Sequence, residues 1–221
     1  MSNNISKTIA YQKVHTETEA EQIYRLRYEI YVREFGWAYQ ADHELEQFHD
    51  EMDEWGHCFY AMRDTEMIAT SRVNIGRAGD FSSYYRKILL LDKFQQYRPD
   101  EPILAVGTRY ALRPTYRNTK VLLKMIEMVV ELAVKDGAHF FLIASHERLV
   151  PLYQRLGWRK YAAPFDDGIA WQCPMVLVLD DVVYLREQKS FLLSALMQRE
   201  ADTEAVDWLL EQEMGVFALE D

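Results

Sequence analysis

Tyr153 is the residue of this sequence whose type and setting most clearly suggest chemistry. It lies in the segment Pro151–Trp158 (PLYQRLGW), which predicts a short helix ended by Gly157 and a strand that starts at Trp158. A phenol on such a helix could face a cleft and donate a proton in a reaction. Alternatively, Tyr153 and Trp158 are core aromatics that hold the helix against a sheet.

A second set of candidate residues combines guanidinium groups, carboxylates and aromatic rings in the N-terminal half. Its aromatic residues follow the first arginine by four and ten positions, and its two aspartates lie in an acidic loop before the second arginine. Arginine and aspartate can satisfy each other through paired hydrogen bonds, which would order the loop. The same groups can instead bind the carboxylate and the ammonium group of an amino acid. The members of the set are Arg27, Tyr31, Trp37, Asp50, Asp53 and Arg72.

Positive charge gathers in the segment Arg113–Lys120 (RPTYRNTK), just before the clearest predicted helix of the chain. Exposed amide groups at the N-terminus of a helix form an anion site, to which nearby basic side chains add. The alternative is an ordinary solvated helix start. The candidate anion-binding residues are Arg113, Arg117, Asn118, Thr119 and Lys120.

The segment around Tyr153 resembles the Leu-Tyr-x-x-x-Gly-Phe segment of the GCN5-related N-acetyltransferase (GNAT) superfamily. The order of the predicted elements agrees with that family over residues 8–180. The resemblance implies acyl transfer from a thioester, with Tyr153 as the proton donor to the leaving thiolate. A phenol suits that role because its ordinary pKa, about 10, is close to that of a thiol. The resemblance also implies that residues 113–120 bind the pyrophosphate of the donor.

The donor segment departs from the family in one respect. The family usually has Arg/Gln-x-x-Gly-x-Gly/Ala here, whereas Arg117–Leu122 (RNTKVL) has no small residue at either glycine position. That change disfavours a close backbone approach to a coenzyme A pyrophosphate. The phosphopantetheine arm of an acyl carrier protein would rely less on such a cradle. We expect acyl-CoA or an acyl-carrier protein as the co-substrate, and no bound cofactor.

The N-terminal set resembles that of the acyl-homoserine-lactone (autoinducer) synthases and the related long-chain N-acyl amino acid synthases. Their pattern is Arg-x3-Phe-x5-Trp, an Asp-x-x-Asp pair and an arginine in a strand, which this sequence matches with Tyr31 in place of phenylalanine. Thr108 and Arg109 also match the family's Glu-x-Ser/Thr-Arg, but Val106 replaces its glutamate. The resemblance implies an acceptor pocket formed by Arg27, Tyr31, Trp37, Asp50, Asp53, Arg72 and Arg109.

An amine nucleophile must lose a proton to a general base. Because the family's glutamate is missing, another residue must serve as that base. Candidate substitutes are Glu29, Glu54, His57 and His146. His146 follows the predicted strand 140–144, where GNAT sites often place polar groups, although a helix cap or a core histidine is the plainer interpretation. We expect a backbone N–H near Thr108 to polarise the thioester carbonyl.

Three functions fit these residues. The first is an N-acyltransferase that moves an acyl group from an acyl thioester to the amine of an amino acid or amino-acid-like metabolite. The second is synthesis of an acyl-homoserine lactone from S-adenosylmethionine, which the missing glutamate disfavours. The third is a non-catalytic binding protein that kept the fold. The Tyr153 segment and the arginine, tryptophan and aspartate pattern favour the first.

A mixed α/β architecture must position these residues. Apolar alternation and helical periodicity predict a mixed α/β fold with one central sheet. The resemblance implies that this is an α+β, GNAT-like fold, with a central, mostly antiparallel sheet flanked by helices. The fourth and fifth predicted strands, 103–112 and 140–144, form its parallel pair, and the last two strands form a hairpin. Other strands are expected at 8–14, 58–62, 67–74, 158–162 and 170–179, and helices at 17–35, 119–135 and 147–156.

Residues 1–180 are expected to form the GNAT-like acyltransferase domain, and residues 181–221 a C-terminal helical extension. Predicted helices at 186–199 and 203–214 have apolar faces that must be buried. They could pack back on the domain, support an oligomer or cover an acyl chain.

Composition narrows the partners and the setting. The chain of 221 residues has a formal net charge of −10, which disfavours nonspecific nucleic-acid binding. No apolar run approaches the roughly 20 residues of a membrane span, and the polar N-terminus lacks a signal core, so we expect a cytoplasmic protein.

Cys58 and Cys173 are expected to be reduced thiols, and no metal site is expected because no His-x3-His or Cys-x2-Cys spacing occurs. The expected partners are a small-molecule amine and, through Arg113, Arg117 and Lys120, an acidic acyl carrier protein.

Overall fold

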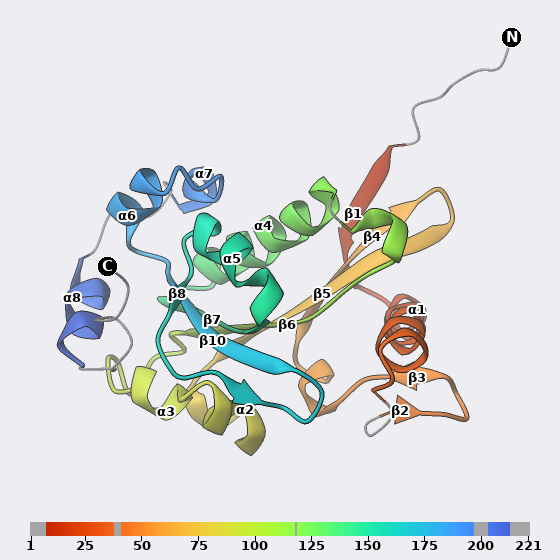
Figure 1. Cartoon of the computed structure of the whole chain (residues 1–221), viewed down its shortest axis with the longest axis horizontal. Coiled ribbons are helices and arrows are strands. Elements are labelled where there is room, and N and C mark those ends of the chain that lie inside the picture. The colour runs from red at the N-terminus through yellow and green to blue at the C-terminus, as the bar shows by residue number, and fades with distance from the viewer. Residues whose placement is uncertain (1–7, 38–40, 118, 197–202, 213–221) are drawn as a thin grey trace, which may run out of the picture. The chain divides into compact units, whose positions relative to one another are not determined.

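The structure is a computed structural model that describes residues 8–37, 41–117, 119–196 and 203–212 (Figure 1). The chain forms two compact units. The first unit contains the residues up to 72 and residues 109–129, and the second contains residues 73–108 and the residues from 130 on. Among the described residues, no helix is long and apolar enough to cross a membrane.

The described strands form a large sheet and a small one. They are β1 (Ile9–Lys13), β2 (Ala41–Asp42), β3 (Gln47–Phe48), β4 (His57–Arg63), β5 (Glu66–Gly76), β6 (Leu104–Leu112), β7 (Phe140–His146), β8 (Arg159–Lys160), β9 (Phe165–Asp166) and β10 (Trp171–Val178). The large sheet has the order β1-β4-β5-β6-β7-β10-β8, with β9 beside β10, and the small sheet pairs β2 with β3. This is the mixed, mostly antiparallel sheet that the sequence predicts.

The described residues form α-helices before, between and after the strands. They are α1 (Glu17–Arg27), α2 (Ser83–Ile88), α3 (Leu91–Phe94), α4 (Lys120–Lys135), α5 (Val150–Leu156), α6 (Val182–Glu187), α7 (Leu193–Leu196) and α8 (Glu204–Glu211). Tyr28–Glu34 form a π-helix. Shorter 3-10 turns lie at Glu51–Asp53, Ala78–Asp80, Pro114–Tyr116 and Glu147–Leu149.

The first helical segment is not a single α-helix. We predicted one helix over 17–35, but α1 ends at Arg27 and the chain continues as a π-helix. At its end the amide of Phe35 donates to the carbonyl of Ile30 at 3.1 Å, which is the five-residue span of a π-helix. Apolar periodicity over so short a stretch does not distinguish the two helix types.

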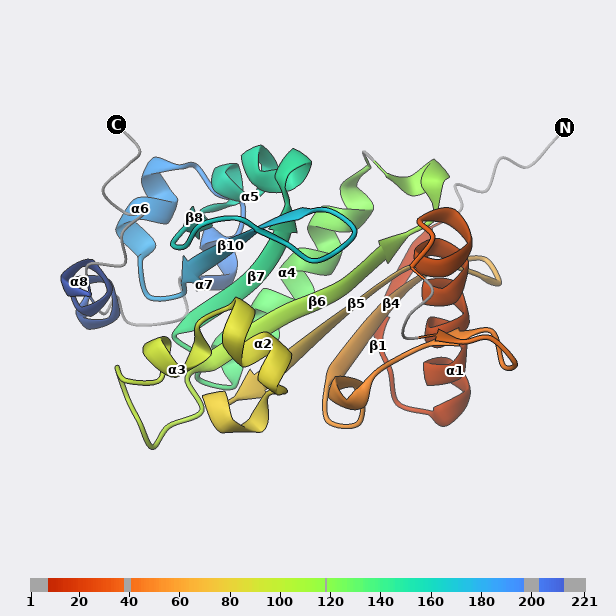
Figure 2. The same cartoon turned by 60° about the horizontal axis from the view of Figure 1, so that its bottom comes forward.

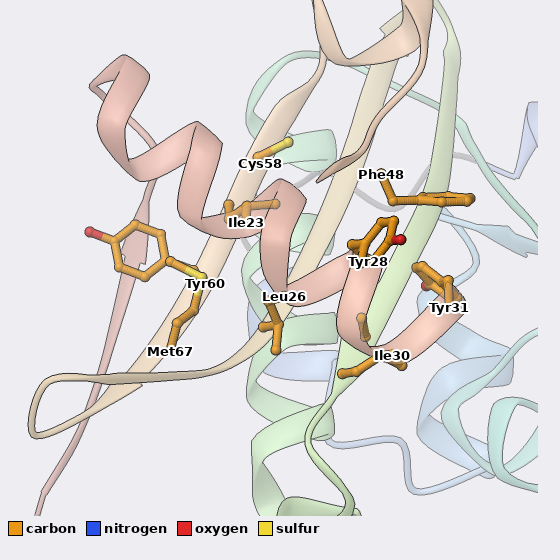
Figure 3. Close-up of a cluster of buried hydrophobic side chains, with 10 residues drawn as sticks. Ile23, Leu26, Tyr28, Ile30, Tyr31, Phe48, Cys58, Tyr60 and Met67 are labelled. Carbon is orange, nitrogen blue, oxygen red and sulfur yellow. The ribbon is translucent and has the colours of Figure 1, made fainter. Parts of the chain in front are cut away.

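The core of the first unit lies between this helical segment and the strands (Figure 3). Tyr28, Ile30 and Tyr31 project from the π-helix in Figure 3, with Phe48 beside them. The strands β1 and β4 pair antiparallel, and β4 and β5 are neighbours in the large sheet. The buried members of this core are Ile23, Leu26, Tyr28, Ile30, Tyr31, Phe48, Cys58, Tyr60, Met67 and Ala111.

The acidic segment 37–53 contains two short strands that the sequence does not predict. It holds the β2–β3 hairpin, with Ala41 opposite Phe48, and the 3-10 turn Glu51–Asp53. Residues 38–40 lie outside the described residues. Strands of two residues show no alternation, so no sequence pattern could predict them.

The second unit contains the parallel pair of strands. β6 and β7 run side by side, with Leu104 opposite Phe140 and Val106 opposite Leu142 (Figure 2). The parallel pair is therefore β6–β7 rather than the fourth and fifth strands of the chain, because the unpredicted β2 and β3 precede it. The hairpin of the last two predicted strands is present as β8 and β10, which pair antiparallel.

The C-terminal helices differ from the prediction in length and position. Two shorter helices, α6 and α7, replace the expected helix 186–199, whereas α8 lies within the expected helix 203–214. Residues 197–202 and 213–221 lie outside the described residues. In the second unit the Trp208 ring of α8 packs against Tyr97 and Phe140, with centroids 5.5 and 5.7 Å away. This helix packs back on the chain, while the domain boundary at residue 180 stays a prediction.

Gly157, in the second unit, is expected to tolerate substitution poorly. It ends α5 with φ +108°, and a Cβ there would lie 2.2 Å from Cδ2 of Leu185. Gly157→Ala should lower the unfolding free energy by about 2–4 kcal/mol, since it adds left-handed strain to overpacking. Gly137→Ala is the matched control, because Gly137 has φ +83° but open space around its Cβ position. Its loss should be about 1 kcal/mol, and equal losses in urea unfolding would contradict the packing argument.

Candidate functional site

A buried charge cluster connects α1, β5 and the acidic segment in the first unit. The side chains of Arg27 and Arg72 are completely buried, and that of Asp53 is 2% exposed. Nη1 of Arg27 donates to Oδ1 of Asp53 at 2.7 Å, and Nη1 of Arg72 lies 2.8 Å from Oδ2. One carboxylate thus bridges two buried guanidinium groups.

The cluster continues outward through Asp50. Arg72 donates to both of its oxygens, at 2.6 and 3.3 Å. Arg109 donates to Oδ2 of Asp50 through Nε at 3.2 Å and also through Nη2. The Arg109 guanidinium lies over the Phe48 ring, 4.7 Å from its centroid. The three arginines and two aspartates alternate, and one positive charge is in excess.

Local backbone chemistry explains the spacing of the two aspartates. Oδ1 of Asp50 accepts a hydrogen bond from the amide of Met52 at 2.9 Å, and Oδ2 of Asp53 accepts from the amide of Asp50 at 3.0 Å. The Asp-x-x-Asp pair is therefore a capping box for the 3-10 turn. Gly56 leaves room for this arrangement, since a Cβ there would meet the Met52 oxygen at 2.6 Å and Cδ of Arg72 at 2.9 Å.

The arginines keep both aspartates ionised. Burial opposes ionisation of Asp50, but the charges of Arg72 and Arg109 outweigh it, so the pKa of Asp50 lies below its usual value. In the same way Arg27 and Arg72 overcome burial and hold the pKa of Asp53 far below its usual value. Cys58 touches the cluster, with Sγ 3.3 Å from Nη2 of Arg27. Burial raises the pKa of the Cys58 thiol, which therefore stays protonated.

These depressed pKa values predict acid lability. Unfolded aspartates titrate near pH 3.9, above the folded pKa values of Asp50 and Asp53, so the unfolded state takes up protons first as the pH falls. Their stabilising contribution is complete above about pH 4 and is lost as the pH falls towards the folded values. Urea unfolding from pH 6 to pH 2.5 should show this decline, and Asp53→Asn should flatten it. An unchanged slope in the variant would contradict the assignment to Asp53.

The aromatic residues of the predicted acceptor set also come together. The rings of Tyr31 and Trp37 stack, with centroids 4.8 Å apart and planes 14° apart. The Tyr31 hydroxyl donates to the carbonyl of Tyr110 at 3.0 Å. Phe48 lies 5.2 Å from the Tyr31 ring and under Arg109, so it joins the aromatic pair to the charge cluster. Sequence reasoning missed Phe48, whose only signal was a large apolar residue in an acidic loop.

Arg109 occupies a strained backbone position. It has φ +56° within β6, which is unusual for a non-glycine residue. The surrounding structure must hold such a residue in place, and the contacts with Asp50 and Phe48 do so. Thr108, the predicted source of the polarising backbone N–H, directly precedes it and is partly buried. The strain therefore marks the point of β6 where the sequence places chemistry.

The predicted donor-binding arginines are engaged by carboxylates. Nη1 of Arg113 donates to Glu29 at 2.7 Å, and its Nε lies 3.0 Å from Glu66. Arg117 donates to both oxygens of Glu34, at 2.5 and 2.7 Å. The charge of both arginines is therefore largely balanced by the protein. Donor binding by this segment stays a prediction.

The other three predicted donor residues differ in their surroundings. Thr119 donates from Oγ1 to the carbonyl of Tyr116 at 2.6 Å and accepts from the amide of Val121 at 3.3 Å, so it serves the helix start. Lys120 is exposed at the first position of α4. Asn118 lies outside the described residues.

Tyr153 is packed as a core aromatic, and its role as a proton donor stays a prediction. In the second unit it projects from α5 with 5% of its surface exposed. Its ring meets Trp158 edge to face at 5.4 Å, and Trp158 meets Phe141 in the same way at 5.7 Å. Both interpretations of Tyr153 therefore stay open, and substitution must separate them.

His146 caps a turn, as its plainer interpretation expects. Its Nδ1 accepts a hydrogen bond from the amide of Arg148 at 3.2 Å. A neutral imidazole that accepts at Nδ1 carries its proton on Nε2, so Nε2 cannot act as a base in this arrangement. Glu29 is engaged by Arg113, whereas Glu54 is exposed and His57 is partly buried. Among the described residues, no three potential metal-ligating side chains converge.

Comparison with known proteins gives a family match. Residues 22–179 match the family model described as N-acyl amino acid synthase FeeM. The FeeM structure from uncultured soil microbes has a TM-score of 0.65 and 15% identity, covering 85% of this chain and 97% of that one. The CoA-dependent acyl-homoserine lactone synthase BjaI, with SAM and isopentyl-CoA, has a TM-score of 0.65 and 16% identity, covering 92% and 100%. An acyl-CoA N-acyltransferase from Pseudomonas aeruginosa has a TM-score of 0.55 and 16% identity, covering 77% and 100%. No curated protein matches the sequence.

Proposed function

The chain belongs to the FeeM N-acyl amino acid synthase family, and from that premise we propose that it joins an acyl group to the amine of an amino acid or amino-acid-like metabolite. Family membership makes the chain an acyltransferase, rather than the non-catalytic binding protein considered above. The match over residues 22–179 carries this conclusion, since it includes the charge cluster, the donor segment and Tyr153.

The reaction that we assign begins with attack of the acceptor amine on the carbonyl carbon of a thioester. The carbon–nitrogen bond forms, and the amine loses its proton to a base or to water. A backbone N–H near Thr108 stabilises the oxyanion of the tetrahedral intermediate. As the carbon–sulfur bond breaks, its electron pair goes to sulfur, and Tyr153 supplies the proton that converts the thiolate into a thiol. The donor is acyl-CoA or an acyl-carrier protein.

We assign different roles to the buried charges of the acceptor set and to its partly exposed charges. Arg27, Asp53 and Arg72 are buried and form ion pairs with one another, which suits a role in ordering the acidic segment. Asp50 and Arg109 are 16% and 11% exposed and adjoin the aromatic pair through Phe48. We assign this outer part to the acceptor pocket, with Tyr31 and Trp37 as its aromatic wall.

A second candidate is an acyl-homoserine-lactone synthase that uses S-adenosylmethionine. The Arg109–Asp50 pair favours it, because Thr108-Arg109 belongs to the pattern of those synthases. Buried Val106 stands where that pattern has its glutamate, which disfavours it. The acceptor in the assay below decides between the two.

The test is thiol release from a panel of acyl-CoAs and acyl-carrier proteins, with mixed amino acids and S-adenosylmethionine as acceptors. Mass spectrometry identifies the product. We expect an N-acyl amino acid. A lactone would favour the second candidate, and folded protein that releases no thiol with any donor would contradict the proposed function.

We also propose a cellular compartment for the enzyme and a contact with its acyl carrier protein. Cys58 and Cys173 are free and buried, which suits the reducing cytoplasm in which we place the enzyme. Exposed Lys120 is the residue of the donor segment that we expect to meet an acidic acyl carrier protein.

A further inference from the structure

Two carboxylates of the π-helix hold the two arginines that follow β6. Glu29 lies at the start of the π-helix and pairs with Arg113, and Glu34 lies at its end and pairs with Arg117. All four residues belong to the first unit. The pairing is thus a two-point clamp, here named the glutamate clamp, between the π-helix and the segment 113–117.

The π-helix explains why both carboxylates can reach that segment. Glu29 and Glu34 are five residues apart, which in an α-helix would turn them about 140° away from each other. A π-helix bridges five residues with each backbone hydrogen bond, so side chains five apart share one face. The bond from the Phe35 amide to the Ile30 carbonyl shows that spacing. The π-helix therefore brings the two carboxylates closer to one face than a regular α-helix would.

Glu34 occupies the face of Arg117 that a phosphate would use. Both terminal nitrogens of Arg117 donate to Glu34, its Nε donates to the Leu112 carbonyl at 3.1 Å, and its guanidinium lies over Phe35. A guanidinium binds carboxylates and phosphates through the same pair of N–H groups, so the two ligands exclude each other. The hydrogen bonds from Arg117 lower the pKa of Glu34, which therefore stays charged at neutral pH.

The Arg117–Glu34 pair is exposed enough for a ligand to displace Glu34. About one third of each side chain is exposed, at 33% for Arg117 and 34% for Glu34. Solvent screening keeps such pairs weak. The Leu112 carbonyl and the Phe35 ring would keep the Arg117 side chain in place after Glu34 has left.

We propose that Glu34 is a phosphate mimic that occupies Arg117 in the donor-free enzyme and is displaced by a phosphate of the thioester donor. This inference rests on the proposed function, which supplies a phosphate-bearing donor. Glu34 is then an affinity-setting residue for the donor, because each binding event must first break its pair with Arg117. The phosphate belongs either to the nucleotide part of coenzyme A or to a phosphopantetheine arm, and the ligands of the test distinguish the two.

The test is isothermal titration of wild type and variants with coenzyme A, free 4′-phosphopantetheine and inorganic pyrophosphate. Glu34→Gln should bind at least one ligand about two- to fivefold more tightly than wild type, the range expected for losing a screened ion pair. Adding Arg117→Gln should abolish the gain. Glu21→Gln is the matched control, because it changes the charge equally and breaks an exposed pair with Arg25 in the same unit. It should leave binding unchanged.

Several results would overturn the proposal. They are unchanged or weaker binding by Glu34→Gln, an equal gain in Glu21→Gln, and no binding of any of the three ligands by either wild type or Glu34→Gln. The acyl-transfer assay separates this failure from that of the proposed function. Acyl transfer by wild type without the Glu34→Gln effect contradicts the phosphate-mimic role of Glu34 alone. A Glu34→Gln effect without acyl transfer supports that role and contradicts the assigned reaction.

Discussion

Asp53→Asn should lower the free energy of unfolding by about 3–5 kcal/mol, because it leaves two buried guanidinium groups without their shared counter-ion. Asp53 contacts Arg27 at 2.7 Å and Arg72 at 2.8 Å, and both arginine side chains are completely buried. The cluster already carries one excess positive charge, and the substitution raises the excess to two. Asparagine keeps the shape of aspartate and an oxygen for the turn, so the loss reports mainly on charge. Urea unfolding at pH 7 measures it.

Asp50→Asn is the matched control for this prediction. Both aspartates cap the same turn, and both bind two arginines, but Asp50 is 16% exposed and its partner Arg109 is 11% exposed. Water can therefore solvate part of the unpaired charge, and the loss should be nearer 2 kcal/mol. If the two variants lose equal stability, burial is not what makes the inner charges important.

Much of the fold was predictable because long or regular patterns determine it. α4 has apolar residues at helical spacing over sixteen positions, and the β6–β7 pair follows from a strand, a crossover helix and a second strand. The π-helix and the two-residue strands β2 and β3 were not predictable. Their local sequences satisfy other structures equally well, and contacts with the rest of the first unit select the one that forms.

The candidate site likewise has features that the sequence predicts and features that it does not. Asp50 and Asp53 cap the same turn, so local backbone contacts determine their spacing. A sequence pattern can reveal such a local feature. Arg117 and Glu34 are 83 positions apart, and their pairing depends on a π-helix. The sequence around either residue therefore contains no pattern that predicts the pair. Sequence reasoning therefore gave Arg117 to the donor without its competitor. Pattern matching identifies which residues carry charge, whereas only coordinates show which charges are already balanced.

Tyr153→Phe should have the largest effect on catalysis. If Tyr153 protonates the leaving thiolate, the turnover number should fall by about 10²- to 10⁴-fold, the usual range for a general acid. The Tyr153 ring packs on Trp158 at 5.4 Å, and phenylalanine preserves this contact, so the variant should keep the fold and bind the donor. Steady-state kinetics, thermal unfolding and donor titration measure the three quantities.

Two comparisons separate chemistry from structure at Tyr153. Tyr161→Phe, in the same unit, removes a buried hydroxyl that donates to the Leu89 carbonyl at 2.8 Å; it should reduce stability by about 1 kcal/mol and leave turnover nearly unchanged. Thioesters of acidic aryl thiols supply the second comparison, because their thiolates leave without a proton and should largely rescue Tyr153→Phe. An equal loss of turnover with alkyl and aryl thioesters would make Tyr153 a packing residue, as its contact with Trp158 also allows.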